Sequence, residues 1–99
     1  MTRQQQILQA IYRAVDDINA ALPLERRLAK SPEISPADHL DSLGMVNFVI
    51  ATEEHLSESI GVTLNLANQQ AMSQEKSPLQ TISTLAHYIE RLLEERSHD

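Results

Sequence analysis

The chain has 99 residues and a mass of 11.1 kDa, which is the size of one ordinary domain. It contains no Cys, which excludes disulfides, thiolate metal sites and cysteine nucleophiles. The net charge of −6 argues against nucleic-acid binding, and residues 37–99 carry ten Asp or Glu against three Arg or Lys. This acidity favours partners with basic protein surfaces, although it could equally serve only solubility.

No segment of the sequence is expected to cross a membrane. The longest nearly apolar stretch, 45–51, has seven residues, whereas a transmembrane helix needs about 20. The first residues, MTRQQQ, lack the succession of basic, apolar and small residues that defines a signal peptide. We therefore expect a cytoplasmic protein, and we also expect a monomer.

The first predicted helix spans residues 3–22. Thr2 is expected to cap its start and Pro23 to close its end. Its apolar residues recur at steps of three and four, which places them on one helical stripe: Ile7, Leu8, Ile11, Val15, Ile18 and Leu22.

A connection of nineteen residues, 23–41, follows this helix and is long for a compact domain. An extra helical turn could form around residues 25–30. The basic residues of this stretch are expected to lie in solvent or to contact acids of the same domain: Arg26, Arg27 and Lys30. Four apolar residues are expected to pin the loop to the helices: Leu24, Leu28, Ile34 and Leu40.

The second long helix is predicted over residues 42–60, with Gly61 as a natural residue to end it. Its apolar residues are too many for one stripe, so it is either buried on two sides or shows apolar groups to a partner. Leu43 and Ile50 share an arc beside the core-facing stripe. The residues expected to face the core are Val46, Val49, Leu56 and Ile60.

A short helix over residues 67–72 and a last long helix over residues 82–96 complete the chain, the latter capped by Thr81. Three main helices, one short helix and a long first loop predict an all-α fold, a small antiparallel helical bundle over residues 1–99.

The triplet Asp41-Ser42-Leu43 stands where the long loop meets the second helix. The start of a helix has free N–H groups and a partial positive charge, so a phosphate on Ser42 would be stabilised there. Asp41 could cap the helix or help a modifying enzyme to hold a metal. Alternatively, Asp and Ser are simply ordinary residues at a helix start.

The sequence around this triplet resembles the acyl carrier protein family, which includes peptidyl carrier domains. The resemblance is specific over residues 40–56, LDSLGMVNFVIATEEHL, where D-S-L precedes an apolar helix that ends in the acidic pair Glu53 and Glu54. It resumes over residues 79–89, LQTISTLAHYI, which is similar to the last helix of the family. The order and spacing of the predicted helices agree with those of the family.

The resemblance implies that Ser42 carries phosphopantetheine, a covalent cofactor taken from coenzyme A by a phosphopantetheinyl transferase, with Asp41 flanking it. The thiol of this arm would hold acyl or aminoacyl groups as thioesters in fatty-acid, polyketide or nonribosomal-peptide synthesis. Such a carrier is not itself an enzyme, and loading and processing enzymes with basic patches recognise it. The residues implied in that recognition are Leu43, Met45, Ile50, Glu53 and Glu54.

Three features depart from the family pattern. The family usually has Gly where this chain has His39, and two positions that are often acidic in fatty-acid carriers are Gly44 and Asn47 here. These departures favour a pathway other than bulk fatty-acid synthesis.

Parts of the sequence also fit functions other than a carrier. A helical interaction adaptor without a prosthetic group would use the same apolar arc, around Leu43, Met45 and Ile50, to bind a partner helix. His39, Asp41 and Ser42 are the residue types of a hydrolase triad, but no oxyanion loop accompanies them. The His residues have no metal-ligand spacing, and we expect His55 and His87 to be solvated.

Overall fold

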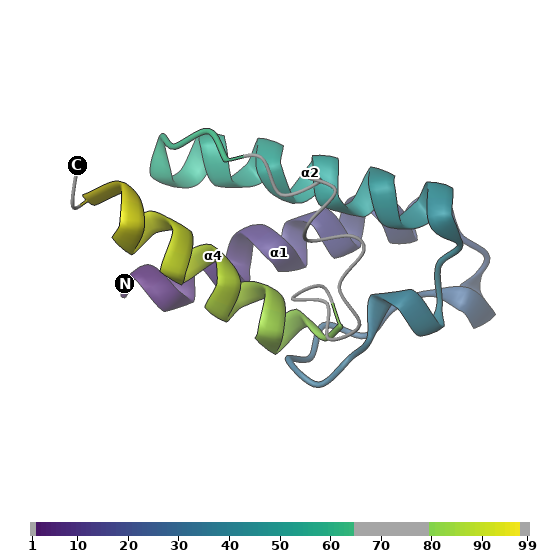
Figure 1. Cartoon of the computed structure of the whole chain (residues 1–99). Coiled ribbons are helices and arrows are strands. Elements are labelled where there is room, and N and C mark those ends of the chain that lie inside the picture. The colour runs from purple at the N-terminus through teal and green to yellow at the C-terminus, as the bar shows by residue number, and fades with distance from the viewer. Residues whose placement is uncertain (1, 65–79, 98–99) are drawn as a thin grey trace.

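The computed structural model describes residues 2–64 and 80–97, and every regular element within them is helical (Figure 1). In chain order these are α1 (Arg3–Asn19), the 3-10 helices η1 (Leu24–Arg26) and η2 (Pro36–Asp38), α2 (Ser42–Ile60) and α4 (Ile82–Ser97). The all-α bundle predicted from the sequence is therefore confirmed. The short helix predicted over residues 67–72 lies outside the described residues.

Helix α1 begins with the cap predicted at Thr2. The hydroxyl of Thr2 accepts the N–H of Gln5 at 3.2 Å, and the Gln5 side chain accepts the N–H of Thr2 at 3.1 Å. The helix ends at Asn19 rather than at residue 22, because the N–H groups of Ala21 and Leu22 bond three residues back and tighten the last turn.

The long loop is held by hydrogen bonds to α1 and to the start of α4. Near α1, the Asn19 side chain donates to Leu28 O at 2.9 Å and accepts from Leu28 N at 2.8 Å. Near α4, Ile34 O accepts the N–H of Ile82 at 3.0 Å, and Pro32 O accepts the N–H of Ser83 at 2.8 Å. Loop carbonyls thus satisfy two of the N–H groups that the start of α4 leaves without a partner in the helix.

The apolar residues of the loop divide into buried and exposed. Leu28 and Leu40 are buried and Ile34 packs against the core, as predicted. The prediction for Leu24 is wrong, because η1 turns this side chain outward and leaves it 76% exposed. Helix formation around residues 25–30 is limited to the single 3-10 turn of η1.

The core forms where α1 packs against both α2 and α4 (Figure 1). Helix α2 runs back along α1, and α4 crosses the other side of α1. None of the described helices is both long and apolar enough to cross a bilayer. The largest fully buried apolar side chains come from all three helices: Ile7, Ile11, Val15, Phe48, Val49, Leu56, Ile82, Leu85 and Ile89.

Helix α2 occupies the predicted range and ends at Gly61, whose φ of 76° is left-handed. Of the residues expected to face the core, Val49 and Leu56 are buried and Ile60 is partly buried. Val46 is instead 36% exposed, because the wide apolar surface of α2 exceeds what α1 covers. Helix α4 begins as predicted, with Thr81 Oγ1 accepting the N–H of Thr84 at 3.1 Å.

We expect Gly61→Ala to destabilise the fold through backbone conformation alone. A Cβ at this position meets nothing within 4 Å, so no steric clash contributes. The left-handed backbone costs an L-residue about 1–2 kcal/mol, and thermal or urea denaturation should show a loss of that size. An unchanged denaturation midpoint would show that the end of α2 can rearrange without cost.

Candidate functional site

Asp41 alone caps the start of α2. Its Oδ1 accepts the N–H of Gly44 at 2.7 Å, and its carbonyl oxygen accepts the N–H of Met45 at 2.9 Å. Ser42 is the first residue of the helix and is exposed, and its hydroxyl has no hydrogen-bond partner among the described residues. The cap therefore leaves the Ser42 hydroxyl accessible and unpaired.

Removing this cap tests its contribution to stability. We expect Asp41→Ala to lower the free energy of unfolding by about 1 kcal/mol, because the Gly44 N–H loses its acceptor. Asp41→Asn should change it little, because Asn caps a helix about as well as Asp. Urea denaturation of the two variants measures the difference, and equal losses would assign the effect to the charge of Asp41 instead.

Exposed apolar side chains follow Ser42 along α2. Leu43 is 70% exposed and Ile50 is 44% exposed, and Val46 lies between them in the sequence. Met45, which the sequence placed on the same recognition surface, is instead buried in the core. We refer to Leu43, Val46 and Ile50 as the apolar arc, and Val46 replaces Met45 in it.

The acidic residues of α2 lie at some distance from Ser42. Glu54 is exposed, whereas Glu53 is half-buried and makes an interaction of its own. At 1.5 Å of rise per residue, Glu53 lies about 16 Å along the helix axis from Ser42. Any recognition of these acids would therefore engage the middle of α2 rather than the turn that bears Ser42.

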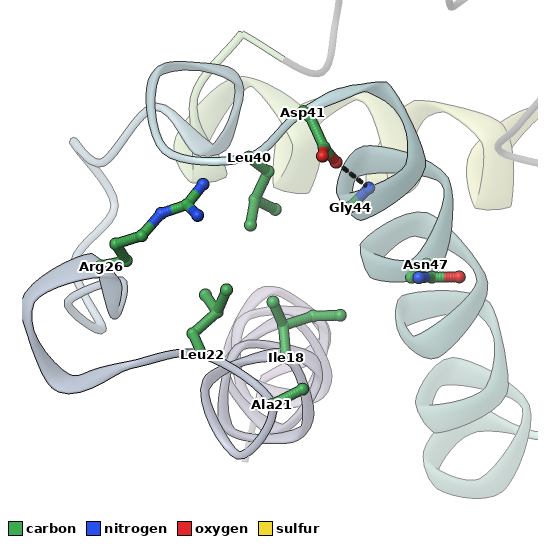
Figure 2. A pocket seen from close by; sticks show the side chains of 8 residues that line it. All are labelled: Ile18, Ala21, Leu22, Arg26, Leu40, Asp41, Gly44 and Asn47. Atoms are coloured by element: carbon green, nitrogen blue, oxygen red, sulfur yellow. Dashed lines mark hydrogen bonds between the residues drawn. The ribbon is translucent and has the colours of Figure 1, made fainter.

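A hollow of about 160 Å³ opens between the end of α1, η1 and the first turns of α2 (Figure 2). The side chain of Arg26 extends into it between Leu40 and Leu22. No local pattern predicts this hollow, because its walls come from three separate segments of the chain. Its lining residues are Ile18, Ala21, Leu22, Arg26, Leu40, Asp41, Gly44 and Asn47.

Gly44 is a point of close approach between α2 and the loop. A Cβ on this residue would lie 3.1 Å from Leu40 Cβ and 3.2 Å from Asp41 Oδ1. The glycine that weakens the helix therefore allows Leu40 to pack against its first turn. This packing accounts for the Gly at a position where the sequence resemblance leads one to expect an acid.

His55 joins α2 to α1, contrary to the prediction that it is solvated. Its Nε2 lies 2.6 Å from Asp17 Oδ2, and its side chain is only 20% exposed. Its Nδ1 is buried and lies 3.8 Å from Glu58 Oε2, which is too long for a hydrogen bond. The two partners are 38 residues apart, so no local sequence pattern could predict the pair.

The other charged residues predicted from the sequence are distributed around the bundle. Lys30 Nζ lies 3.1 Å from Asp16 Oδ1, and Arg27 Nε donates to Leu22 O at 3.2 Å, as expected of a basic cluster that contacts its own domain. His87 is exposed, and no group of described His, Asp and Glu residues is arranged to hold a metal ion. Comparisons with family models, with curated proteins and with solved structures find no match to this chain.

Proposed function

We propose that this protein is a carrier that bears phosphopantetheine on Ser42 and presents acyl or aminoacyl thioesters to partner enzymes. One observation carries the proposal: Asp41 takes the whole capping role, so the neighbouring hydroxyl remains exposed and unpaired at the start of a 19-residue helix. A serine that served only as a cap would have its hydroxyl bonded to the backbone.

The start of α2 suits a phosphodiester on this hydroxyl. Ser42 and Leu43 occupy the first two positions of the helix, where backbone N–H groups have no acceptor within the helix. These N–H groups and the helix dipole stabilise a negative charge. This stabilisation would offset the repulsion between the phosphodiester and the Asp41 carboxylate. The arm would supply the thiol that the chain, having no Cys, does not contain.

The apolar arc would be the surface that partner enzymes contact beside the arm. Exposed apolar side chains in a group are typical of sites of protein interaction, and the arc lies on the same helix as Ser42. The acids farther along α2 would attract enzymes with basic patches. The transferase and the loading enzymes would both approach this face.

The proposal is tested by modification in vitro. Purified protein is incubated with coenzyme A and a broad-specificity phosphopantetheinyl transferase, and its intact mass is measured. We expect the wild type to gain the mass of one phosphopantetheine and Ser42→Ala to gain nothing. Ser59→Ala, which changes another exposed serine of α2, is the matched control and should be modified like the wild type.

Two results would refute the carrier function. One is a wild type that gains no mass under conditions in which a known carrier is fully modified. The other is an equal gain in Ser42→Ala, which would place the modification elsewhere.

A second function, a helical adaptor that binds a partner without an arm, is favoured by the exposure of the apolar arc alone. It uses Leu43 and Ile50 directly and leaves Ser42 without a role. Partner binding unchanged in Ser42→Ala, together with an unmodified wild type, would favour the adaptor over the carrier.

A further inference from the structure

We propose that the hollow between α1, η1 and the start of α2 binds a small apolar amino acid as its zwitterion. The proposal goes beyond the carrier function and does not depend on it, because none of the lining residues is Ser42. It rests on three properties of the hollow: a guanidinium without a partner, a carboxylate with one free oxygen, and an apolar floor.

Arg26 supplies the positive charge. Its side chain is exposed and makes no hydrogen bond or ion pair with any described residue, unlike the side chains of Arg27 and Lys30, which are both engaged. Figure 2 shows its guanidinium extending from η1 toward the centre of the hollow. The planar fork of a guanidinium matches the geometry of a carboxylate, so this group would bind the carboxylate of the ligand.

Asp41 supplies the negative charge on the opposite wall. Its Oδ1 is bonded to the N–H of Gly44, but its Oδ2 has no partner among the described residues. No ion pair joins Asp41 to Arg26, although both line the same hollow. In a ligand with both an ammonium and a carboxylate, the ammonium pairs with Asp41 and the carboxylate pairs with Arg26. An acid without an ammonium is repelled by Asp41, and an amine without a carboxylate is repelled by Arg26.

The floor sets the size and polarity of the rest of the ligand. Ile18 and Leu22 contribute aliphatic surface below the two charges, and Leu40 contributes aliphatic surface between them (Figure 2). The volume of about 160 Å³, in a hollow that stays open to solvent, leaves room for a side chain of about four to six carbons. Leucine has both the side chain and the zwitterionic head that this description requires.

The test is an NMR titration of the whole chain with leucine. We expect saturable shifts of the methyl groups of Ile18, Leu22 and Leu40, with no shift at Ile89, which lies in the core on α4. For a ligand of this size we expect a dissociation constant of roughly 1 mM. The absence of saturable shifts at these three residues would overturn the proposal.

Substitutions of charged residues inside and outside the hollow test whether Arg26 and Asp41 bind the ligand. Arg26→Gln and Asp41→Asn should each weaken binding about tenfold, whereas Arg13→Gln and Asp38→Asn, which change exposed charges outside the hollow, should leave it unchanged. Asp41→Asn retains the helix cap, and circular dichroism verifies that each variant is folded. Ser42→Ala should bind leucine like the wild type. Failure of the proposed carrier function and failure of the proposed leucine site can therefore be distinguished.

Leucine is also compared with 4-methylpentanoate, which lacks the ammonium, and with 3-methylbutylamine, which lacks the carboxylate. Each should bind about tenfold more weakly than leucine. Equal binding of the acid would show that the site recognises carboxylates alone. Equal binding of the amine would remove Arg26 from recognition, and either result would overturn the zwitterion assignment.

Discussion

Phe48→Ala is expected to be the most destabilising single truncation in the core, lowering the free energy of unfolding by about 3–5 kcal/mol. Phe48 is fully buried and has the largest side chain among the fully buried residues. Its loss would remove apolar burial and leave a cavity where α2 packs on α1, which the surrounding helices can close only in part by moving together. Domains of this size have about 5–15 kcal/mol of stability in all, so the variant would be close to unfolding at room temperature.

Urea denaturation followed by circular dichroism measures this loss. Phe48→Leu is the matched variant, because it keeps an apolar side chain of similar reach, and it should cost about 1–1.5 kcal/mol. A loss below about 1 kcal/mol for Phe48→Ala would show that the core is more plastic than the burial of this residue indicates.

The long helices could be predicted from the sequence because their signals are local. The stripe of α1, the cap at Thr2 and the stop at Gly61 depend on residues within a few positions of one another, and each is present in the structure. The orientation of side chains on α2 was predicted less well. Met45 and Val46 are adjacent, and the choice of which one is buried depends on where α1 crosses the helix, which the sequence of α2 does not specify.

The candidate site was predictable in part for the same reason. Asp41 and Ser42 are neighbours whose chemistry follows from the start of one helix, so their roles as cap and exposed hydroxyl could be proposed in advance. The hollow and the contact between His55 and Asp17 require segments that are distant in sequence to meet. The direction of Leu24 depends on the single 3-10 turn of η1, for which the sequence offered only a weak signal.

Truncation of the apolar arc should separate partner recognition from stability. We expect the double variant Leu43→Ala, Ile50→Ala to reduce kcat/KM for phosphopantetheinyl transfer by at least about tenfold, because exposed apolar anchors contribute about 1–2 kcal/mol each to recognition. Its free energy of unfolding should fall by no more than about 1 kcal/mol, since both side chains are substantially solvated in the free protein.

Val49→Ala is the matched control, because Val49 immediately precedes Ile50 but is fully buried. It should show the opposite pattern, a loss of about 1–3 kcal/mol in stability with transfer to Ser42 unchanged at a temperature where the variant is folded. Large stability losses in the arc variant would assign Leu43 and Ile50 to the core. Unchanged kcat/KM would show that the apolar arc is not the recognition surface. The transferase would then reach Ser42 from the side of α1, where the hollow lies.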